Sequence, residues 1–560
     1  MSLSFAEIAQ ERPPDRPSPD AWWRNGVIYQ IYPRSFQDAD GDGIGDLNGI
    51  RQRLGYVAAL GVDAIWISPF FPSPMADFGY DVADYCDVDP RFGTLADFDA
   101  LMAEAKALGL RVILDLVPNH TSELHPWFAQ SRSSRSDPKR DWYLWRDPAE
   151  GGGPPNNWLS NFGGPAWTLD APSGQYYAHM FLKEQPDLNW RHPEVRAAMY
   201  EVMRFWLRRG VDGFRVDVIY HLIKDDEYRD NPVNPAFVPG GDPAHRLLPE
   251  YTADRPEVQS IVLEMRRVLD EFGTPESARV LIGEVYLPVQ RLMNYYGMDA
   301  AGVLRGAQLP FNFHLIGADW QAQAIDRLVR DYEVALPAGA APNWVLGNHD
   351  KPRIASRIGA GGARLAAMLL LTLRGTPTLY YGDELGMTDV PIPLAEVQDP
   401  FERRAPGHGL GRDPQRTPMP WRSDAPAAGF STGRPWLRLG SDAPDLSVDR
   451  QQGDPHSMLH LYRQLLALRR RTAALHEGAW TPLGVQGNVL IYARGDPPQR
   501  VVVLLNFSAS MATVDVRRLP RVSPTPCIWL STLLDRQGEV IGGDSTLLRP
   551  EEGLMLGPQR

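Results

Sequence analysis

The chain has 560 residues, enough for roughly two to four domains of ordinary size, although a β/α barrel can use more than about 250 residues as one domain. Hydrophobic residues make up 43% and charged residues 22%, a globular balance that excludes wholesale disorder, collagen and coiled coil. The net charge of −12 argues against nucleic acid or an anionic membrane as a partner. No apolar run reaches the roughly 18–20 residues that span a bilayer, so no transmembrane helix is predicted.

The N-terminal residues and the cysteines bear on location. Residues 1–20 mix acids, arginines and prolines without the apolar stretch of a signal peptide, and we expect a flexible arm there. Cys86 and Cys527 are the two cysteines, too few for a disulfide framework and typical of a reducing compartment. These features predict a cytoplasmic protein.

From Trp22 onward, short runs rich in Val and Ile alternate with stretches of helical period. Near-continuous apolar runs separated by helices are typical of a parallel sheet that is buried on both faces. The candidate strands span residues 26–32, 62–68, 111–117, 213–219, 279–285, 306–313, 343–347 and 376–381, and the helical stretches include 50–60, 95–108, 193–209 and 258–272. Eight such strands are the number that a closed barrel needs, so the predicted fold class is α/β, a (β/α)8 TIM barrel.

Two regions break this rhythm. Residues 121–187 are rich in Trp, Asn, Gly and Pro and show no clean period, which predicts a small domain inserted after the third strand. Beyond a helix around 458–471, short strands follow one another with turn signals between them, which predicts a C-terminal antiparallel β domain. We expect the catalytic barrel to comprise residues 21–120 and 188–474, the inserted domain 121–187, and a C-terminal β-sandwich 475–560.

Polar side chains stand where several of these strands end. They are His120, Arg215, Asp217, Glu284, His349 and Asp350. A β/α barrel carries its active site at the C-terminal ends of its strands. One acid after a strand is more often a helix cap or a surface charge, but several acids converging on one mouth repel one another and cost free energy. The pattern therefore predicts an active site at this end of the barrel.

Paired carboxylates without a His/Cys metal cluster favour acid/base or nucleophilic work on a neutral bond, with glycoside hydrolysis as the leading case. Arg215, two residues from Asp217, is expected to keep that acid ionised as the nucleophile. Glu284 would hold a proton as the general acid, and Asp350 could bind sugar hydroxyls.

Four ordered segments resemble the signature regions of the α-amylase superfamily, glycoside hydrolase family 13. They are Ile113–His120, Gly213–Ile219, Ile282–Tyr286 and Val345–Asp350. Other segments resemble its oligo-1,6-glucosidase and α-glucosidase subgroup: Asp77–Asp81, Gln185–Trp190, Gly375–Gly386 and Gly411–Trp421. The resemblance implies a retaining enzyme with Asp217 as nucleophile, Glu284 as acid/base and Asp350 as transition-state stabiliser.

The resemblance also implies the residues that bind substrate. Asp77, Tyr80, His120, Arg215 and His349 match the glucose subsite at the scissile bond, and Phe162, Phe181 and Gln185 match positions that line the pocket. Arg412, rather than Arg416, is expected to pair with Asp77 and close the pocket floor, which would make the enzyme exo-acting. Val218 follows the nucleophile, where valine tends to accompany α-1,6 bonds in the subgroup, and Lys351 stands where the family often has glutamine.

The loop Asp38–Asp46 places acids at alternate positions between glycines, as hard-cation sites do. It resembles the first half of an EF-hand loop, although Gly49 stands where the bidentate Glu would be. The subgroup often binds Ca²⁺ or Mg²⁺ at the matching loop, so a structural ion is expected. Its expected ligands are Asp38, Asp40, Asp42, the Ile44 carbonyl and Asp46; the alternative is a solvated turn.

The function predicted is an exo-acting, retaining α-glucosidase that releases glucose from short α-glucosides such as maltose, isomaltose or sucrose through a covalent glucosyl-enzyme. One alternative is transglucosylation or isomerisation by the same residues, as in trehalose synthase or sucrose isomerase. An alternative of another class is a non-catalytic sugar-binding homologue, which would need a membrane anchor or lost carboxylates. The expected oligomeric state is a monomer or a homodimer.

Overall fold

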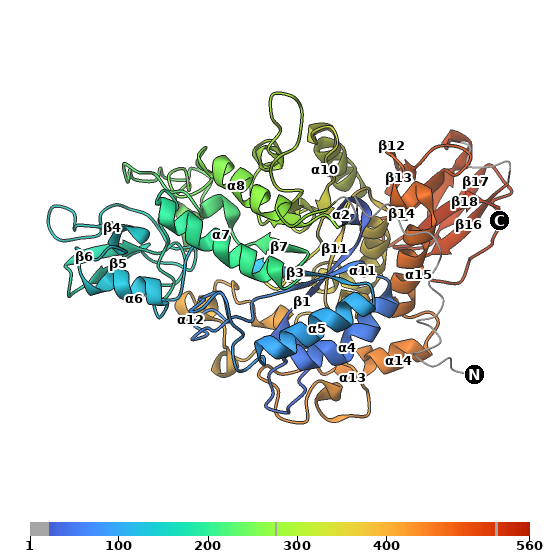
Figure 1. The fold of residues 1–560 in the computed structure, drawn as a ribbon. Helices are drawn as coiled ribbons and strands as arrows, with labels where there is room; N and C mark the ends of the chain where they lie inside the picture. Colours follow the sequence, from blue (N-terminus) through green and yellow to red (C-terminus); the bar gives the residue numbers. More distant parts are fainter. Residues whose placement is uncertain (1–21, 275–276, 521–524, 560) are drawn as a thin grey trace.

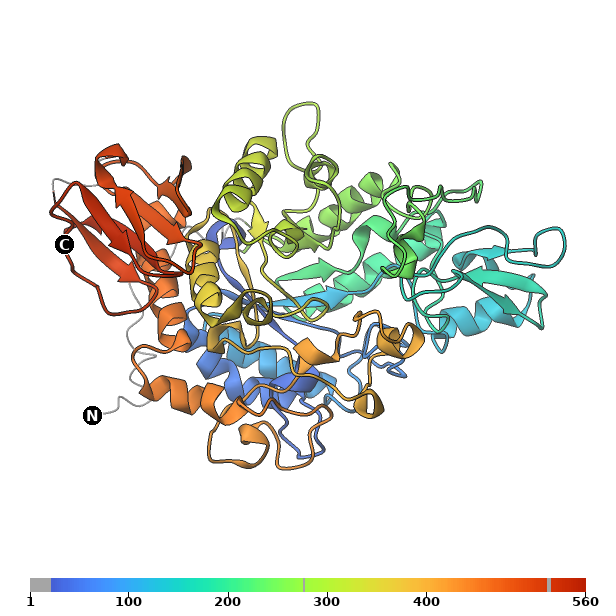
Figure 2. The same ribbon diagram turned by 180° about the vertical axis from the view of Figure 1, so that it is seen from behind.

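The computed structural model describes residues 22–274, 277–520 and 525–559, so the predicted arm at residues 1–20 lies outside the described residues. Three parts follow one another along an elongated molecule (Figure 1). The β/α barrel lies in the middle, the small sheet of the inserted segment at one end and the C-terminal sheets at the other. The view from behind in Figure 2 gives the same arrangement.

The barrel is an eight-stranded parallel sheet in the order β10-β9-β8-β7-β3-β2-β1-β11. Its strands are β1 (Ile28–Ile31), β2 (Ala64–Ile67), β3 (Arg111–Leu116), β7 (Gly213–Val216), β8 (Val280–Gly283), β9 (Leu309–Asn312), β10 (Asn343–Trp344) and β11 (Thr378–Tyr380). A parallel bridge between Val345 and Thr378 joins the two ends and closes the ring. The predicted (β/α)8 fold is confirmed, with each strand inside its predicted range.

Helices surround the barrel strands. They are α4 (Leu47–Leu60), α5 (Leu95–Ala107), α7 (Pro193–Arg208), α8 (Val258–Asp270), α10 (Ala322–Ala335) and α11 (Ile354–Thr372). Helix α4 begins three residues earlier than its apolar pattern predicts, because the Asp46 carboxylate caps it by accepting the Gly49 N–H. Helix α5 begins at a reciprocal capping box between Thr94 and Asp97.

The inserted segment forms its own small sheet. Strands β4 (Trp145–Arg146), β5 (Trp167–Asp170) and β6 (Gln175–Ala178) pair antiparallel in the order β4-β6-β5, and α6 (Pro126–Ser133) accompanies them. An apolar cluster of Leu144, Trp158, Ala166, Trp167, Ala178 and Met180 fills this part of the molecule. The high Trp content of the sequence here therefore supplies a local core.

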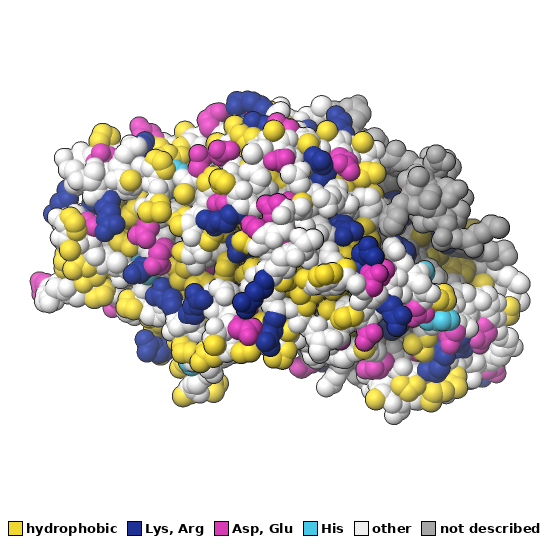
Figure 3. Space-filling view, turned by 90° about the horizontal axis from the view of Figure 1, so that it is seen from below, with side chains coloured by type: hydrophobic (Ala, Val, Ile, Leu, Met, Phe, Trp, Pro, Cys, Tyr) yellow, Lys and Arg dark blue, Asp and Glu magenta, His cyan; other side chains and the backbone are white. Residues whose placement is uncertain are grey.

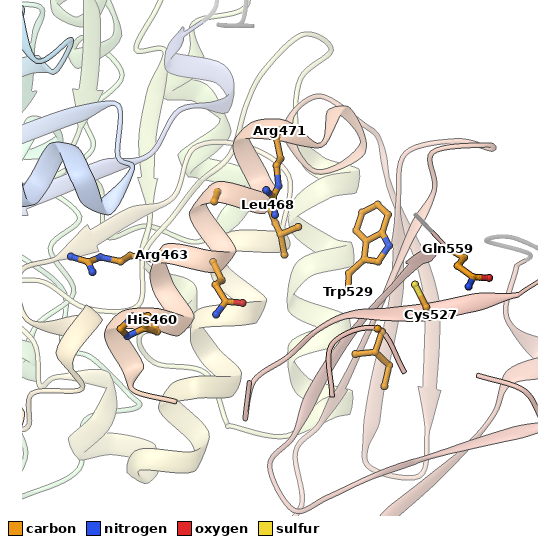
Figure 4. A pocket seen from close by; sticks show the side chains of 11 residues that line it. His460, Arg463, Leu468, Arg471, Cys527, Trp529 and Gln559 are labelled. Atoms are coloured by element: carbon orange, nitrogen blue, oxygen red, sulfur yellow. The ribbon is translucent and has the colours of Figure 1, made fainter. Parts of the chain in front are cut away.

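The C-terminal part is antiparallel, as the sequence predicts. A five-stranded sheet in the order β12-β13-β14-β18-β16 faces a two-stranded sheet, β15-β17, across an apolar cluster. The strands are β12 (Trp480–Gln486), β13 (Val489–Arg494), β14 (Val501–Asn506), β15 (Ala512–Asp515), β16 (Pro526–Ser531), β17 (Ser545–Leu548) and β18 (Gly553–Pro558). A hollow of ≈ 470 Å³ separates this part from helix α15 (Met458–Arg471) (Figure 4). In that view, Arg463 points away from Trp529 and Cys527.

Helix α11 is 19 residues long with a mean hydropathy of 1.3, so by length and composition alone it could cross a membrane. By these two measures, length and mean hydropathy, the expectation that no apolar stretch is long enough to span a bilayer was wrong. Its apolar window is 61% buried inside the protein, and the helix packs against α15 and strands β14 and β18. These contacts make α11 a core helix between the barrel and the C-terminal sheet.

On the face drawn in Figure 3, acidic and basic side chains are interspersed among polar and apolar ones. In the interior, by contrast, two arginines bind carbonyls near the boundary between barrel and C-terminal sheet, and one of them, Arg494 on β13, crosses it. Arg469 donates to the carbonyls of Leu371 and Leu373, where α11 ends, and Arg494 donates to Thr372 and Leu475. Carbonyls at a helix C-terminus carry partial negative charge, so they accept these buried cations without a carboxylate.

We expect the substitution Arg494→Met to lower the free energy of unfolding by about 3 kcal/mol, because the carbonyls it binds stay buried without that donor. Urea denaturation followed by circular dichroism measures this. Arg471→Met, at an exposed position of α15, is the matched control and should change the free energy by less than about 0.5 kcal/mol. Equal stability of the two variants would contradict the assigned role of Arg494.

Candidate active site

The predicted site residues converge at the C-terminal mouth of the barrel. His120 follows β3, Asp217 follows β7, and Glu284 follows β8. His349 and Asp350 follow β10. All are buried except Asp350, whose side chain is 23% exposed.

One guanidinium lies at the centre of this group. Arg215 Nη1 donates to Asp115 Oδ1 at 2.9 Å and to Asp217 Oδ1 at 2.7 Å. Its Nη2 lies 2.7 Å from Glu284 Oε2, which also accepts the backbone N–H of Val218 at 2.9 Å. The two predicted catalytic carboxylates therefore bind the two ends of the same guanidinium.

Three buried carboxylates share this single cation, and their protonation reflects the imbalance. Burial raises the pKa of Asp217 well above its usual range, Glu284 and Asp115 add to the effect, and Arg215 opposes it. Burial likewise raises the pKa of Asp115 to about 6. Arg215 contacts Asp217 as expected, and it favours the ionised form of that acid. Burial and the two neighbouring carboxylates act against it.

Val218 adopts a left-handed backbone, with φ 37° and ψ 44°. This region is strongly disfavoured for a β-branched residue and costs of order 1–3 kcal/mol. The turn directs the Val218 N–H at Glu284, so the strained backbone helps to hold a carboxylate of the central cluster. The side chain of Val218 is buried beside that cluster.

His349 lies between two aromatic rings. The Tyr80 ring stacks on it with a centroid distance of 5.4 Å and an interplanar angle of 6°. The Tyr32 ring stacks on it with a centroid distance of 5.6 Å and an interplanar angle of 19°. The amide nitrogen of Gln30 lies 2.8 Å from His349 Nδ1, and His349 Nε2 lies 3.2 Å from Asp350 Oδ2. Burial lowers the pKa of His349 well below its usual range, so the ring is neutral.

Tyr80 is held at both ends of its side chain. Its ring packs on His349, and its hydroxyl donates to Asp115 Oδ2 at 3.0 Å. The aromatic face that the sequence predicts for glucose is thus fixed in place by its neighbours.

Asp350 faces two arginines. Arg416 donates to Asp350 Oδ1 at 2.8 Å, and Arg412 reaches the same oxygen at 3.4 Å. Burial alone would raise the pKa of Asp350, but the guanidinium groups of Arg416 and Arg412 lower it below its usual range. Asp350 is therefore ionised throughout the physiological pH range.

The partner of Asp77 is Arg412. Arg412 Nη2 donates to Asp77 Oδ1 at 2.6 Å, while Arg416 contacts Asp350 instead. Asp399, fully buried, accepts from Arg412 Nε and Nη2 at 3.0 and 2.6 Å. This carboxylate holds the Arg412 fork in the plane that reaches Asp77.

The remaining predicted pocket residues surround Asp77. Gln185 Nε2 lies 3.2 Å from Asp77 Oδ2 and 3.2 Å from His120 Nε2. Phe181 packs on His120 at 5.2 Å. Phe162 packs on Phe181, and the Arg412 guanidinium lies over the Phe162 ring at 4.9 Å. The structure thus brings all the predicted substrate-binding residues into one connected group.

Sequence reasoning missed Asp115, Gln30 and Asp399. Asp115 had a signal, since it is a charged residue inside an apolar strand and its register partner is Arg215. Gln30 is likewise a polar residue within the apolar strand β1. Asp399 had no such signal, because it lies in an irregular loop, away from every motif.

A cavity of ≈ 550 Å³ is lined by residues of the segments that follow Glu284 and Asp350 in the chain. Tyr286 lines it, stacked on Phe313 at 4.2 Å and 15°, together with Ile316, Leu287 and Lys351. The Lys351 ammonium lies 5.3 Å from the Tyr286 ring. The wall of this cavity is mostly apolar and carries one cation.

The predicted metal loop is partly assembled. Carboxylate oxygens of Asp38, Asp40 and Asp42 lie within 4.8 Å of one another, a donor set that fits Ca²⁺ or Mg²⁺. Asp46 does not join this group, because its two oxygens accept the N–H groups of Ala39 and Gly49 at the start of α4. Ile44 donates its N–H to Asp42.

A closed β/α barrel with carboxylates around an arginine at its mouth defines an enzyme of the glycoside hydrolase class. Residues 30–478 match the family model for the alpha amylase catalytic domain. A protein named probable alpha-glucosidase from Rhizobium meliloti is 46% identical over 508 residues, 88% of this chain and 91% of its own length. The chain belongs to the α-amylase family.

Solved structures of enzymes with related chemistry are also similar. An alpha-glucosyl transfer enzyme superposes with a TM-score of 0.87 at 41% identity, covering 96% of this chain and 99% of its own. An isomaltulose synthase mutant from Erwinia rhapontici, solved with its natural substrate sucrose, has a TM-score of 0.85 at 33% identity, covering 96% and 99%. Enzymes named for glucosyl transfer and for isomaltulose synthesis therefore share this fold over nearly their whole length.

We expect Asp115→Asn to shift the acidic limb of the kcat/KM profile to lower pH by about one unit. The substitution removes a negative charge that raises the pKa of Asp217, so the cluster loses its proton at lower pH. Initial rates on p-nitrophenyl α-glucoside between pH 4 and 9 measure the shift, with exposed Glu104→Gln as the control. A limb that stays in place, or moves upward, would contradict the shared-proton interpretation.

Proposed function

We propose that this protein is an exo-acting, retaining α-glucosidase that releases glucose from short α-glucosides such as maltose, isomaltose and sucrose. The observation that carries the proposal is the shared guanidinium, which holds Asp217 and Glu284 side by side at the barrel mouth. The name of the relative that is 46% identical, alpha-glucosidase, supports the same substrate class.

In this proposal, Asp217 attacks the anomeric carbon while Glu284 gives its proton to the departing oxygen, which breaks the glycosidic bond and leaves a glucosyl ester on Asp217. Glu284, now a carboxylate, takes a proton from water, and the resulting nucleophile displaces Asp217 to release glucose.

The remaining residues would bind the glucose ring. Asp350, kept ionised by Arg416, is suited to accept sugar hydroxyls and to strengthen its hold as positive charge develops on the ring. Asp77 and Arg412 would contact the hydroxyls of the non-reducing end. Because this pair closes the pocket, a longer chain could not pass through it, and cleavage would be exo.

A second function, glucosyl transfer to acceptors other than water, is favoured by the cavity that Tyr286 and Lys351 line. Its wall of Tyr286, Phe313 and Ile316 suits the apolar face of an acceptor. A covalent glucosyl-enzyme can pass glucose to any hydroxyl held there, and a structurally similar protein is an alpha-glucosyl transfer enzyme. We propose that transfer accompanies hydrolysis and rises with acceptor concentration.

We further propose that Asp38, Asp40, Asp42 and the Ile44 carbonyl bind a structural Ca²⁺ or Mg²⁺, with Asp46 as a neighbour that shapes the loop. The proximity of three carboxylates supports this proposal.

A cytoplasmic location is proposed as well, supported by the free thiols of Cys86 and Cys527.

Asp217→Ala should fold normally and lose at least about 10⁴-fold in kcat, because the glucosyl ester cannot form. Chromatography of products from maltose, isomaltose and sucrose with the wild-type enzyme gives the substrate class. Added azide should restore turnover in the variant by attacking the anomeric carbon from the face that Asp217 occupies, which gives the inverted product, β-glucosyl azide. Near-normal turnover by Asp217→Ala would contradict the nucleophile, and no glucose or new glucoside from any sugar would contradict the substrate class.

Chelation with EDTA should lower the melting temperature by several degrees if the acidic loop holds an ion, because a ligand bound to the folded state alone stabilises it. Readdition of Ca²⁺ should restore the original melt. In Asp40→Asn/Asp42→Asn, EDTA should have little effect, since both changes remove exposed ligands. A wild-type melt that EDTA leaves unchanged would identify the loop as a solvated turn.

A further inference from the structure

Lys224 is a buried cation close to the site, outside every motif that the mechanism uses. The chain has five lysines among its 57 basic residues, and Lys224, 2% exposed, is the one that is buried. Burial lowers the pKa of Lys224, and the Asp187 carboxylate opposes that effect. A lysine ammonium is a compact point charge with three N–H donors, which suits a small, fully enclosed space.

The ammonium joins two segments that are far apart in sequence. Its Nζ lies 2.7 Å from Asp187 Oδ2, where the chain returns from the inserted segment. It also donates to Asn119 Oδ1 at 2.6 Å, at the end of β3. Lys224 itself follows Asp217 in the loop after β7. The cation therefore ties the loop of the proposed nucleophile to the end of the neighbouring strand.

These contacts fix the orientation of the Asn119 amide. An oxygen must face the ammonium, so the amide nitrogen takes the other side. There Nδ2 donates to Asp187 Oδ1 at 3.1 Å, and a carboxylate can only accept. A rotated amide would place its NH₂ against the ammonium and its oxygen against the carboxylate, which makes both contacts repulsive.

The orientation of Asn119 in turn decides where His120 carries its proton. Asn119 Nδ2 lies 3.1 Å from His120 Nδ1, and an NH₂ group facing that nitrogen requires it to accept. Burial lowers the pKa of His120 to about 4, so the ring carries a single proton. That proton is left on Nε2, which donates to the Tyr80 carbonyl at 3.0 Å.

We propose that Lys224, together with Asp187, is a positioning residue that holds His120 in its Nε2–H tautomer for the glucosyl reaction. This rests on the proposed function. The Nε2–H group fastens the Tyr80 backbone at the glucose pocket. The Gln185 NH₂, 3.2 Å from the same nitrogen, has two other acceptors, Asp77 Oδ2 and the Tyr80 carbonyl, so it does not require Nε2 to accept. The other tautomer would turn a lone pair toward the Tyr80 carbonyl and loosen that wall of the pocket.

Nitrogen NMR of the free wild-type protein tests the proposal directly. Protein labelled with ¹⁵N in its 12 histidine rings is recorded at neutral pH, and His120 is assigned by its absence in His120→Gln. We expect one pyridine-type signal from Nδ1 and one pyrrole-type signal from Nε2. A pyrrole-type Nδ1, or averaged shifts that indicate both tautomers, would overturn the proposal whatever the enzyme hydrolyses.

The double variant Lys224→Met/Asp187→Asn removes both charges and keeps the approximate shapes. Since the amide that replaces the Asp187 carboxylate can donate or accept, the Asn119 amide loses its fixed orientation. We expect His120 to show both tautomers and kcat/KM on p-nitrophenyl α-glucoside to fall about tenfold, the worth of one hydrogen bond. An unmixed Nε2–H signal, or mixed tautomers with unchanged kcat/KM, would overturn the proposal.

The matched control is Lys183→Met/Glu184→Gln, which neutralises an ion pair near Asp187 in sequence whose two members are 61% and 28% exposed. It should leave both the His120 signals and kcat/KM unchanged. A tenfold loss in this control as well would overturn the specific role of Lys224. If the wild type hydrolyses no α-glucoside, the proposed function fails, while the spectrum still decides the tautomer.

Discussion

The buried guanidinium of Arg215 is the interaction on which this site depends. Three carboxylates, those of Asp115, Asp217 and Glu284, face it from three adjacent strands. Such a group would not hold together in an open loop, because like charges in a buried space repel strongly. The barrel holds the charges in place, because the register of β3 and β7 pairs Asp115 with Arg215 and so fixes the carboxylate beside the guanidinium. The left-handed turn at Val218 then adds a backbone donor to Glu284.

A second network, assembled from long-range contacts, would close the pocket in the proposed function. Arg412 comes from an irregular loop after the last barrel strand and binds Asp77 from the loop after β2. Asp399 holds the other edge of the same guanidinium, and Phe162 from the inserted segment packs on its face. Three separate loops thus meet on one side chain. The depth of the pocket is therefore a property of loop packing, whereas the reacting centre is a property of the barrel.

This division explains what could be predicted from the sequence. The eight strands and the acids at their ends are local patterns, since apolar runs and the residues after them lie together in the chain. The choice of Arg412 over Arg416 as the partner of Asp77 followed from resemblance to the family. Asp399 could not be found, because nothing local distinguishes a buried loop acid from an exposed one. The raised pKa of Asp217 could not be predicted from the sequence either, since Arg215 is visible two residues away but the burial that opposes its effect is not.

The balance of charge in the whole site fits chemistry on a neutral sugar. Six carboxylates belong to the two networks, those of Asp77, Asp115, Asp217, Glu284, Asp350 and Asp399, against three guanidinium groups, those of Arg215, Arg412 and Arg416. Both histidines are neutral and add no positive charge. An excess of negative charge held in fixed positions does little for a neutral glucoside in its ground state. In the proposed reaction, it stabilises the positive charge that develops on the ring as the glycosidic bond breaks. The arginines therefore offset the repulsion among the buried acids, while the acids stabilise the transition state.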